Sequence, residues 1–348
     1  MSNGLSLKEI AAKLNVSPAT VSLVFHNRDG VNADTRSRVR QELVANGYIH
    51  ASETDASEAA TDIRLLKYTP IGYPDDSFLD NLIIDGICAQ AKKVQYNVVI
   101  TTCHESEFEK VFHRMCSAQP KGLIVLGTSM PLVYENYFND LQIPLVLVNT
   151  HLPLCNVDNV VFDYQLGVFT LVQYLKSLGH TSIGYLYSSF QTSKSLDGYH
   201  AFLEALSRFE LPLNKEHILP VNPYYDQVYN NIISVLQSTS GVPTAFIAET
   251  DSQAIGLINA VKARGLRVPE DISVVSLGGG PYCKLTEPQI TSYSIPGEAI
   301  GKYAVNLLYT KLHDPSMAVC RMKVSGELVI KESAKNISGK KTGQIAFA

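Results

Sequence analysis

Hydrophobic residues near the start of the chain recur at the spacing of an amphipathic helix. They occupy positions 7, 10, 11 and 14, and they overlap the segment Ser6-Leu7-Lys8-Glu9, which has the S-x-x-E form of a helix capping box. The pattern predicts a short helix that ends near Asn15.

Two further helices are predicted before residue 50. Ser17 followed by Pro18 is a strong helix start, because serine caps a backbone N–H and proline loses nothing at the first helical position. Apolar residues at 21, 24 and 25 would face inward in this second helix. A third helix is expected after Asn32, with apolar residues at 39, 43 and 44 and a stop at Asn46-Gly47. Three helices joined by a tight turn predict a helix-turn-helix unit that binds DNA through its second helix, with a partner-binding three-helix bundle as the alternative.

The chain changes its pattern from Ile63 onward, where short apolar, β-branched runs alternate with helical stretches. The runs cover residues 97–101, 122–127, 144–149, 182–187, 244–249 and 272–277. Strands of this kind, buried on both faces, indicate doubly wound parallel sheets. Ligands of such sheets bind beyond the carboxyl ends of the strands. The last stretch, 334–348, has no periodicity and is expected to be disordered.

Composition excludes several classes of protein. The 348 residues are 45% hydrophobic and 18% charged, as in a globular protein with two or three cooperating units. A membrane span needs about 18 consecutive apolar residues, and none occur. The N-terminus has no secretory pattern, so a cytoplasmic location is expected. The six cysteines, at 88, 103, 116, 155, 283 and 320, show no C-x-x-C spacing and are expected to be buried thiols rather than disulfides or zinc ligands.

Charge is distributed unevenly along the chain. The net charge is −4, yet residues 1–50 hold six lysines and arginines against four carboxylates, a local charge of +2 that leaves −6 for the remainder. A mildly basic head on an acidic body is typical of a small anion-binding module attached to a larger domain.

The first fifty residues also carry specific motifs. They contain A-x-x-x-x-V-S-x-x-T-V-S from Ala11 to Ser22, T-R-x-x-V from Thr35, and a closing Gly47-Tyr48. This segment closely resembles the DNA-binding headpiece of the lactose-repressor (LacI) family of bacterial transcription regulators. By that resemblance, Pro18, Ala19 and Leu23 face base edges. The positions that hold phosphates and complete the predicted DNA-binding set are Ser17, Thr20, Ser22, Asn27, Thr35 and Arg36.

The base-facing residues are apolar, which sets an expectation about the operator. Apolar side chains discriminate bases through thymine methyl groups and through the shape of the duplex. We therefore expect fewer direct hydrogen bonds to bases than an arginine or glutamine would make. For Leu23 the alternative is an ordinary surface hydrophobe.

Residues 51–62 stand where the family has its hinge, but they depart from its pattern. His50 and Ala51 replace the expected Pro-Asn, and Ser57 falls about where a wedge leucine belongs. Four carboxylates precede the first cation, Arg64, and they would repel a phosphate backbone. A flexible acidic linker is the favoured interpretation, and a helix that starts at Ser52 is the alternative.

The resemblance continues through the body. Residues 177–186 resemble the family's G-H-x-x-I-G segment, 267–275 its V-P-x-D-I-S-V motif, and 288–308 its T-P-x-x-T-x-x-x-P stretch with the following helix. The resemblance implies a periplasmic-binding-protein-like core over 63–333 with an effector cleft between two subdomains. The N-terminal subdomain would hold about 63–163 and 293–322, and the C-terminal one about 164–292 and 323–333.

The same resemblance assigns candidate effector contacts. Asp251 matches a cleft-facing position that accepts hydrogen bonds, and Phe78 matches an aromatic that stacks on a sugar or base. Two family anchors are absent: Ser195 stands at an arginine position, with Lys194 beside it as a non-equivalent substitute, and Gly278 stands at an aspartate position. The other matched candidates are Asp163, Tyr224 and Tyr225. Without the two anchors, either the effector differs in kind and is bound by Tyr73, Thr128, Ser129, Asn149 and Lys194, or effector control has weakened. Ordinary packing or a solvated strand end is the alternative for each of them.

These observations predict a homodimeric repressor that binds a pseudo-palindromic operator and responds to a small, sugar-like molecule, with no cofactor and no metal. An enzyme is the first rival, but "SLGGGPYCKL" matches neither phosphate-binding glycine motif, and the histidines form no ligand pattern. The second rival is a small-molecule-binding protein with a vestigial headpiece.

Overall fold

The computed structural model describes residues 5–25, 30–46, 48, 61–70, 77–139, 141–190, 192–222, 229–230, 232–233, 236 and 241–339. The chain divides into two units, Met1–Thr61 and Asp62–Ala348. Four predicted site residues lie outside the described ranges: Asn27, Tyr73, Tyr224 and Tyr225. Most of the predicted hinge also lies outside them, and its last two residues, Thr61 and Asp62, already belong to the first strand of the core.

The three predicted headpiece helices are confirmed. Helix α1 (Leu7–Leu14) begins with the capping box between Ser6 and Glu9 and ends at Asn15, whose φ of 52° is left-handed. Helices α2 and α3 are Pro18–Phe25 and Ala33–Ala45. A small core made by all three helices buries Ile10, Ala11, Val21, Val24, Val39 and Leu43. The helical spacing of these apolar residues is what brings the three helices together.

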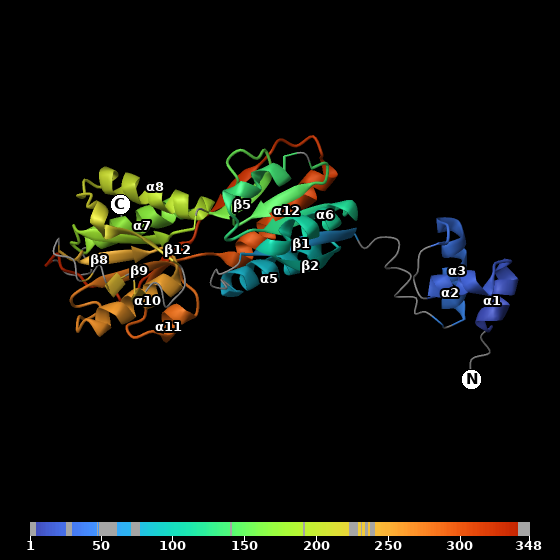
Figure 1. Cartoon of the computed structure of the whole chain (residues 1–348), viewed down its shortest axis with the longest axis horizontal. Coiled ribbons are helices and arrows are strands. Elements are labelled where there is room, and N and C mark those ends of the chain that lie inside the picture. The colour runs from blue at the N-terminus through green and yellow to red at the C-terminus, as the bar shows by residue number, and fades with distance from the viewer. Residues whose placement is uncertain are drawn as a thin grey trace. The chain divides into compact units, whose positions relative to one another are not determined.

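The core contains two six-stranded sheets (Figure 1). In order across the first sheet, the strands are β11 (Arg321–Val324), β5 (Asp158–Phe162), β4 (Leu145–Val148), β3 (Gly122–Leu126), β1 (Thr61–Thr69) and β2 (Tyr96–His104). Across the second they are β12 (Glu327–Val329), β10 (Thr291–Ser294), β9 (Ser273–Gly278), β8 (Ala245–Ala248), β6 (Ile183–Ser188) and β7 (Ile218–Val221). Each of the six predicted runs overlaps one of these strands, and the described registers are parallel except that β12 runs antiparallel to β10.

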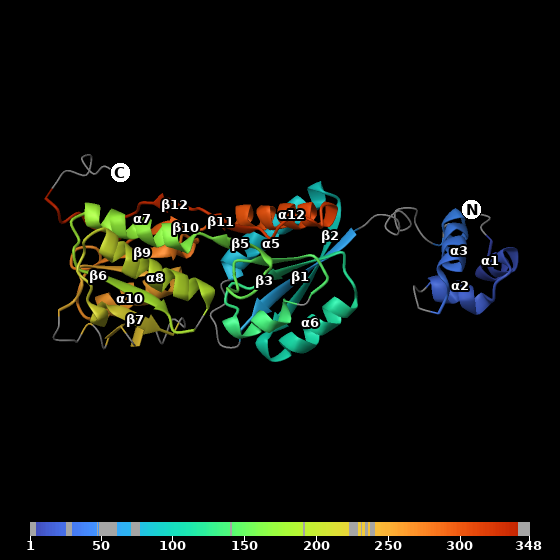
Figure 2. The same cartoon turned by 90° about the horizontal axis from the view of Figure 1, so that it is seen from above.

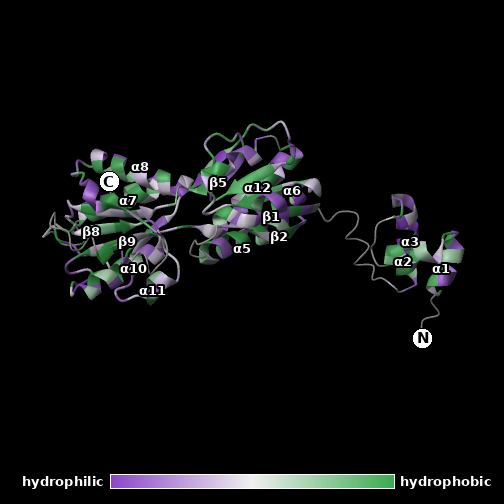
Figure 3. Ribbon diagram, viewed as in Figure 1, coloured by the Kyte–Doolittle hydropathy of each residue, from purple (hydrophilic) through white to green (hydrophobic). Residues whose placement is uncertain are grey.

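Helices cover both faces of each sheet. Helices α5 (Ser77–Lys93) and α12 (Gly297–His313) lie together on one face of the first sheet, and α6 (Phe108–Ser117) lies on the other (Figure 2). In the second subdomain α7 (Tyr164–Ser177) and α8 (Ser193–Arg208) face α10 (Asp251–Ala263) across the sheet. The remaining short helices are η2 (Glu105–Glu107), η3 (Leu132–Tyr137), η4 (Lys215–His217) and α11 (Tyr282–Leu285). Hydrophobic residues concentrate on the strands and on the helix faces turned toward them (Figure 3).

The chain crosses between the subdomains three times. The crossings follow β5, β10 and β11. The predicted boundaries near 293 and 323 fall inside β10 and β11, because ladder pairing continues to Ser294 opposite Gly278 and to Val324 opposite Phe162. The observed crossings therefore come about two residues later than predicted.

Two further expectations need correction. Residues 334–339 are ordered, since the Ile337 N–H donates to the Leu178 carbonyl at 2.7 Å and His180 lies 3.0 Å from the Lys335 carbonyl. Backbone pairing of this kind does not depend on hydrophobic periodicity, so the expectation of disorder was wrong for this part of the tail. All six cysteines are free thiols, but Cys88 is exposed and only Cys103, Cys155 and Cys283 are buried. Among the described residues, none of the helices is long and apolar enough to cross a membrane.

Candidate functional site

The second headpiece helix presents an apolar face. Ser17, Pro18, Ala19 and Ser22 are exposed, while the two valines of the same helix are buried. Leu23 is half-buried, consistent with a side chain at the edge of this face. Helix α2 carries no arginine, lysine, glutamine or asparagine. The exposed surface therefore offers methyl and methylene groups flanked by hydroxyls.

Ser17 holds the start of this helix. Its Oγ accepts a hydrogen bond from the Thr20 amide at 3.0 Å and lies 2.8 Å from the Thr20 hydroxyl. On helix α3, the Asn32 side chain accepts from the Thr35 amide at 2.8 Å. Thr35 and Arg36 are half-buried beside that helix start. Four of the predicted phosphate-contacting residues, Ser17, Thr20, Thr35 and Arg36, thus lie at two helix N-termini, which favour anions because their N–H groups and dipoles point outward. Ser22 lies further along α2.

A cavity of about 220 Å³ lies between the two subdomains of the core. One wall comes from the start of α5, and the other comes from the carboxyl ends of strands in the second sheet. The lining residues are Phe78, Leu79, Leu82, Tyr164, Lys194, Glu249, Thr250, Asp251, Ser252, Leu277, Gly278, Gly279, Gly280, Tyr282, Ser294 and Ile295. Ser294 is the last residue of β10 and Ile295 begins the crossing that follows it, so the cavity adjoins a segment that links the subdomains.

Asp251 binds the protein's own backbone at the edge of the cavity. Its Oδ1 accepts hydrogen bonds from the Ser276 hydroxyl at 2.7 Å and the Gly279 amide at 3.2 Å, and its Oδ2 accepts from the Gly280 amide at 2.7 Å. A side chain at Gly278 would collide with this carboxylate. The glycine run is therefore the partner of Asp251, and most of the acceptor capacity of the carboxylate is used inside the protein.

Glu249 is the buried carboxylate of the cavity. It is 1% exposed, and its Oε2 accepts from the Ser188 amide at 2.6 Å and from the Ser195 hydroxyl at 3.1 Å. Ser195, which stands at the family's arginine position, is thus engaged with Glu249, and it does not line the cavity. Lys194, 4% exposed, brings a cation to the cavity wall instead. Burial raises the pKa of the nearby Tyr185 phenol well above its ordinary value, a shift that Glu249 strengthens and Lys194 opposes.

Two predicted effector residues, Thr128 and Asn149, belong to a buried hydrogen-bond network in the first subdomain. Asn149 donates from Nδ2 to the Thr128 hydroxyl at 3.3 Å, and that hydroxyl donates to Asp80 Oδ1 at 2.6 Å. Lys67 lies 3.5 Å from Asp80 Oδ2. Ser129 is buried next to Thr128. The predicted residues Thr128, Ser129 and Asn149 follow β3 and β4 in the chain, but they do not line the cavity.

Asp163 lies at a crossing and not in the cavity. It caps α7 by accepting from the Leu166 amide at 3.1 Å, and Lys323 of β11 lies 4.0 Å away. Of the predicted effector residues that the structure describes, only Phe78, Lys194, Asp251 and Gly278 line the cavity. The sequence reasoning missed Glu249, although its place at the end of β8, two residues before Asp251, was a usable signal. In the part of the chain that the structure describes, no group of three or more histidine, cysteine, aspartate or glutamate residues could hold a metal ion.

Sequence comparisons agree with this architecture. Residues 6–50 match the bacterial regulatory proteins of the lacI family, and residues 172–334 match the periplasmic binding protein-like domain. This chain belongs to the LacI family. The family resemblance and the predicted fold class are confirmed, and the chain is a DNA-binding transcription regulator.

This chain is similar to other transcription regulators over nearly its whole length. The HTH-type transcriptional repressor CytR of Escherichia coli K12 is 26% identical over 337 residues, which cover 95% of this chain and 96% of CytR. Catabolite control protein A of Priestia megaterium is 24% identical and covers 95% and 99%. The lac repressor dimer bound to operator and an anti-inducer has a TM-score of 0.72 at 19% identity, covering 96% of this chain and 100% of that one. A CelR–cellobiose complex has a TM-score of 0.68 at 20% identity, covering 95% and 100%.

Proposed function

We propose that this LacI-family chain is a cytoplasmic, homodimeric repressor with no catalytic activity, and that a small sugar-related molecule in the core cavity controls its affinity for operator DNA. Two headpieces place their α2 helices in successive major grooves of a pseudo-palindromic site. Hydroxyls and helix N-termini contact phosphates, and Pro18, Ala19 and Leu23 contact base edges.

The exposed apolar face of α2 is the observation that carries this proposal. Ser17 caps the start of this helix, and the exposed Pro18 and Ala19 that follow it cannot hydrogen-bond to water through their side chains. The same groups fit the thymine methyl of the major groove. Relatives of this chain are repressors by name, which supports the direction of regulation.

The cavity supports a compact effector. Relatives have been solved with cellobiose, sucrose and ribose, so polyhydroxylated ligands are the first class to test. Phe78 supplies a ring face, and Lys194 and Glu249 supply one cation and one carboxylate. Lysine binds hydroxyls as a single charge and lacks the bidentate fork of arginine, so we expect a ligand that differs from those of arginine-bearing relatives.

Selection from a random duplex pool at about 50 mM salt, followed by titration of single-base variants, tests the DNA half of the proposal. Replacing Leu23 by Ala should reduce discrimination at one base pair about fourfold, the effect of losing roughly one buried methylene contact. The control Ser22→Ala removes an exposed hydroxyl and should weaken all sequences alike. Failure of the purified dimer to retain any duplex at this salt would overturn the proposal.

A further inference from the structure

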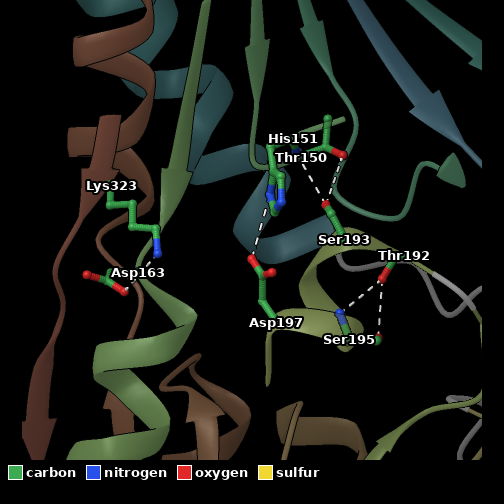
Figure 4. Close-up of polar contacts among 8 residues, drawn as sticks. All are labelled: Thr150, His151, Asp163, Thr192, Ser193, Ser195, Asp197 and Lys323. Carbon is green, nitrogen blue, oxygen red and sulfur yellow. Dashed lines mark hydrogen bonds and ion pairs between the residues drawn. The ribbon is translucent and has the colours of Figure 1, made fainter. Parts of the chain in front are cut away.

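A second set of contacts joins the subdomains beside the cavity (Figure 4). The loop after β4 supplies Thr150 and His151, and the first turns of α8 supply Ser193 and Asp197. The His151 amide donates to Ser193 Oγ at 3.3 Å, and Thr150 Oγ1 lies 3.4 Å from the same atom. His151 Nδ1 lies 3.6 Å from Asp197 Oδ2. We call these four residues the seam.

The seam and the cavity share one helical turn. Lys194, which lines the cavity, follows Ser193 directly in α8 and precedes Asp197 by three residues. Thr192, which caps this helix, forms a β-bridge with Pro131 of the first subdomain. Any opening of the seam therefore moves the start of α8 and the cation that it presents to the cavity.

Charges of opposite sign face each other across the seam. His151 of the first subdomain lies opposite Asp197 of the second, and Lys323 of β11 lies 4.0 Å from Asp163 at the crossing after β5. His200 of α8 also acts on Asp197. Burial raises the pKa of the Asp197 carboxyl, and the charges of His151, Lys323 and His200 partly offset that effect.

The geometry points to a protonation-dependent clasp: when His151 is charged, its attraction to Asp197 holds the two subdomains together and so sets how readily the cavity closes on an effector. This inference deepens the proposed function, because it names the regulation of the same cavity. Histidine changes its charge between pH 5 and 8. Protonation of the imidazole strengthens the clasp, and protonation of the Asp197 carboxylate removes it.

Hydrogen exchange at the seam tests this clasp without DNA or effector. The His151 amide hydrogen is bonded to Ser193 across the seam, so its protection factor reports seam opening. In the full chain we expect this protection, corrected for the intrinsic pH dependence of exchange, to rise about two- to fivefold between pH 8 and pH 6. In Asp197→Asn it should be lower by a similar factor and nearly flat with pH.

Glu109→Gln is a matched control, because Glu109 Oε1 lies 3.9 Å from His113 Nε2 in an exposed pair within α6. This variant should leave the protection of the His151 amide unchanged. Lys323→Met is a second test that keeps the proposal falsifiable if Asp197→Asn fails to fold, and it should lower protection because it removes the other cation near Asp197. Wild-type protection in Asp197→Asn at every pH would overturn the clasp. Since the readout needs neither ligand nor operator, that result is distinguishable from a failure of the proposed function.

Discussion

The carboxylate of Asp251 accepts the Gly280 amide hydrogen at 2.7 Å, and this contact ties the start of α10 to the loop after β9. Gly279 and Ser276 bond to the same carboxylate. Ile295 lies in the crossing to the first subdomain, and its N–H donates to the Gly278 carbonyl at 2.9 Å. Asp251 is thereby a structural support of the cavity, one step from the link between the subdomains.

Replacing Asp251 by Asn should destabilise the core. One carboxylate oxygen becomes an NH₂ group facing a backbone N–H, which removes an acceptor from a charged hydrogen-bond cluster and costs about 1–3 kcal/mol. Urea unfolding followed by tyrosine fluorescence reports the core, because 17 of the 18 tyrosines lie beyond residue 61. The control is Asp85→Asn at an exposed position of α5, expected within about 0.5 kcal/mol of the parent. Equal stability of the two variants would contradict the supporting role of Asp251.

Gly279 and Gly265 form a matched pair for substitution by alanine. Their φ angles are +76° and +73°, so alanine is strained by about 1–2 kcal/mol at each position. A Cβ at Gly279 would lie 2.9 Å from Ser294 Cα, whereas a Cβ at Gly265 meets nothing within 4 Å. Gly279→Ala should therefore unfold at distinctly lower urea concentration than Gly265→Ala. Similar midpoints would show that the end of β10 can move aside at little cost in free energy.

Alanine substitutions at Ser17 and Ser22 distinguish the loss of a helix cap from the loss of an exposed hydroxyl in the headpiece. Ser17→Ala removes the cap on the Thr20 amide and should destabilise α2 by about 0.5–2 kcal/mol. Ser22 is exposed on the same helix, so Ser22→Ala should leave helix stability nearly unchanged. Hydrogen exchange of residues 18–25 measures the difference. Faster exchange in the Ser22 variant than in the Ser17 variant would be incompatible with this cap.

His180 predicts an acid-dependent loss of stability. Its ring nitrogens lie 2.9 Å from Thr244 Oγ1 and 3.0 Å from the Lys335 carbonyl, and burial lowers the pKa of this imidazole, an effect that the Lys335 bond partly opposes. The unfolded chain therefore takes up a proton at a higher pH than the folded chain. The stability due to neutral His180 is complete above the unfolded value of 6.5 and declines as the pH falls below it.

Urea titrations at pH 7.5 and 5.5 check this prediction. The contribution of one histidine reaches at most about 1.4 kcal/mol per pH unit. His180→Asn should be less stable at pH 7.5 but should lose less on acidification. His113→Gln, at an exposed site of α6, should keep the pH dependence of the parent chain. If the free energy of unfolding of His180→Asn changed with pH as it does in the parent chain, the acid sensitivity would belong to other groups.

Local rules carried the prediction of the elements. Capping at Ser6, Ser17 and Asn32 depends on hydrogen bonds within three residues, and so it is legible from sequence spacing alone. Buried strands can also be recognised from the sequence, because β-branched residues favour strands. The ordered stretch 334–339 was missed because backbone and polar contacts hold it against His180, more than 150 residues away in the chain.

The predicted site residues also differ in how far their positions follow from the local sequence. Phe78, Lys194, Asp251 and Gly278 were expected at the cleft and do line the cavity. Ser195 was expected there too, but it turns to Glu249, and this pairing requires the spatial meeting of α8 with the end of β8. Nothing in the local sequence around position 195 specifies that partner.

The sequence by itself determined the headpiece helices, the alternation of strands and helices, and the family, because these follow from periodicity, capping and contiguous motifs. Only the tertiary structure decided that Asp251 holds a glycine loop, that Glu249 lies in the cavity wall and that His151 meets Asp197. Each of those contacts joins segments brought together by the packing of separate strands and helices. Their distances depend on the whole fold and not on any local pattern.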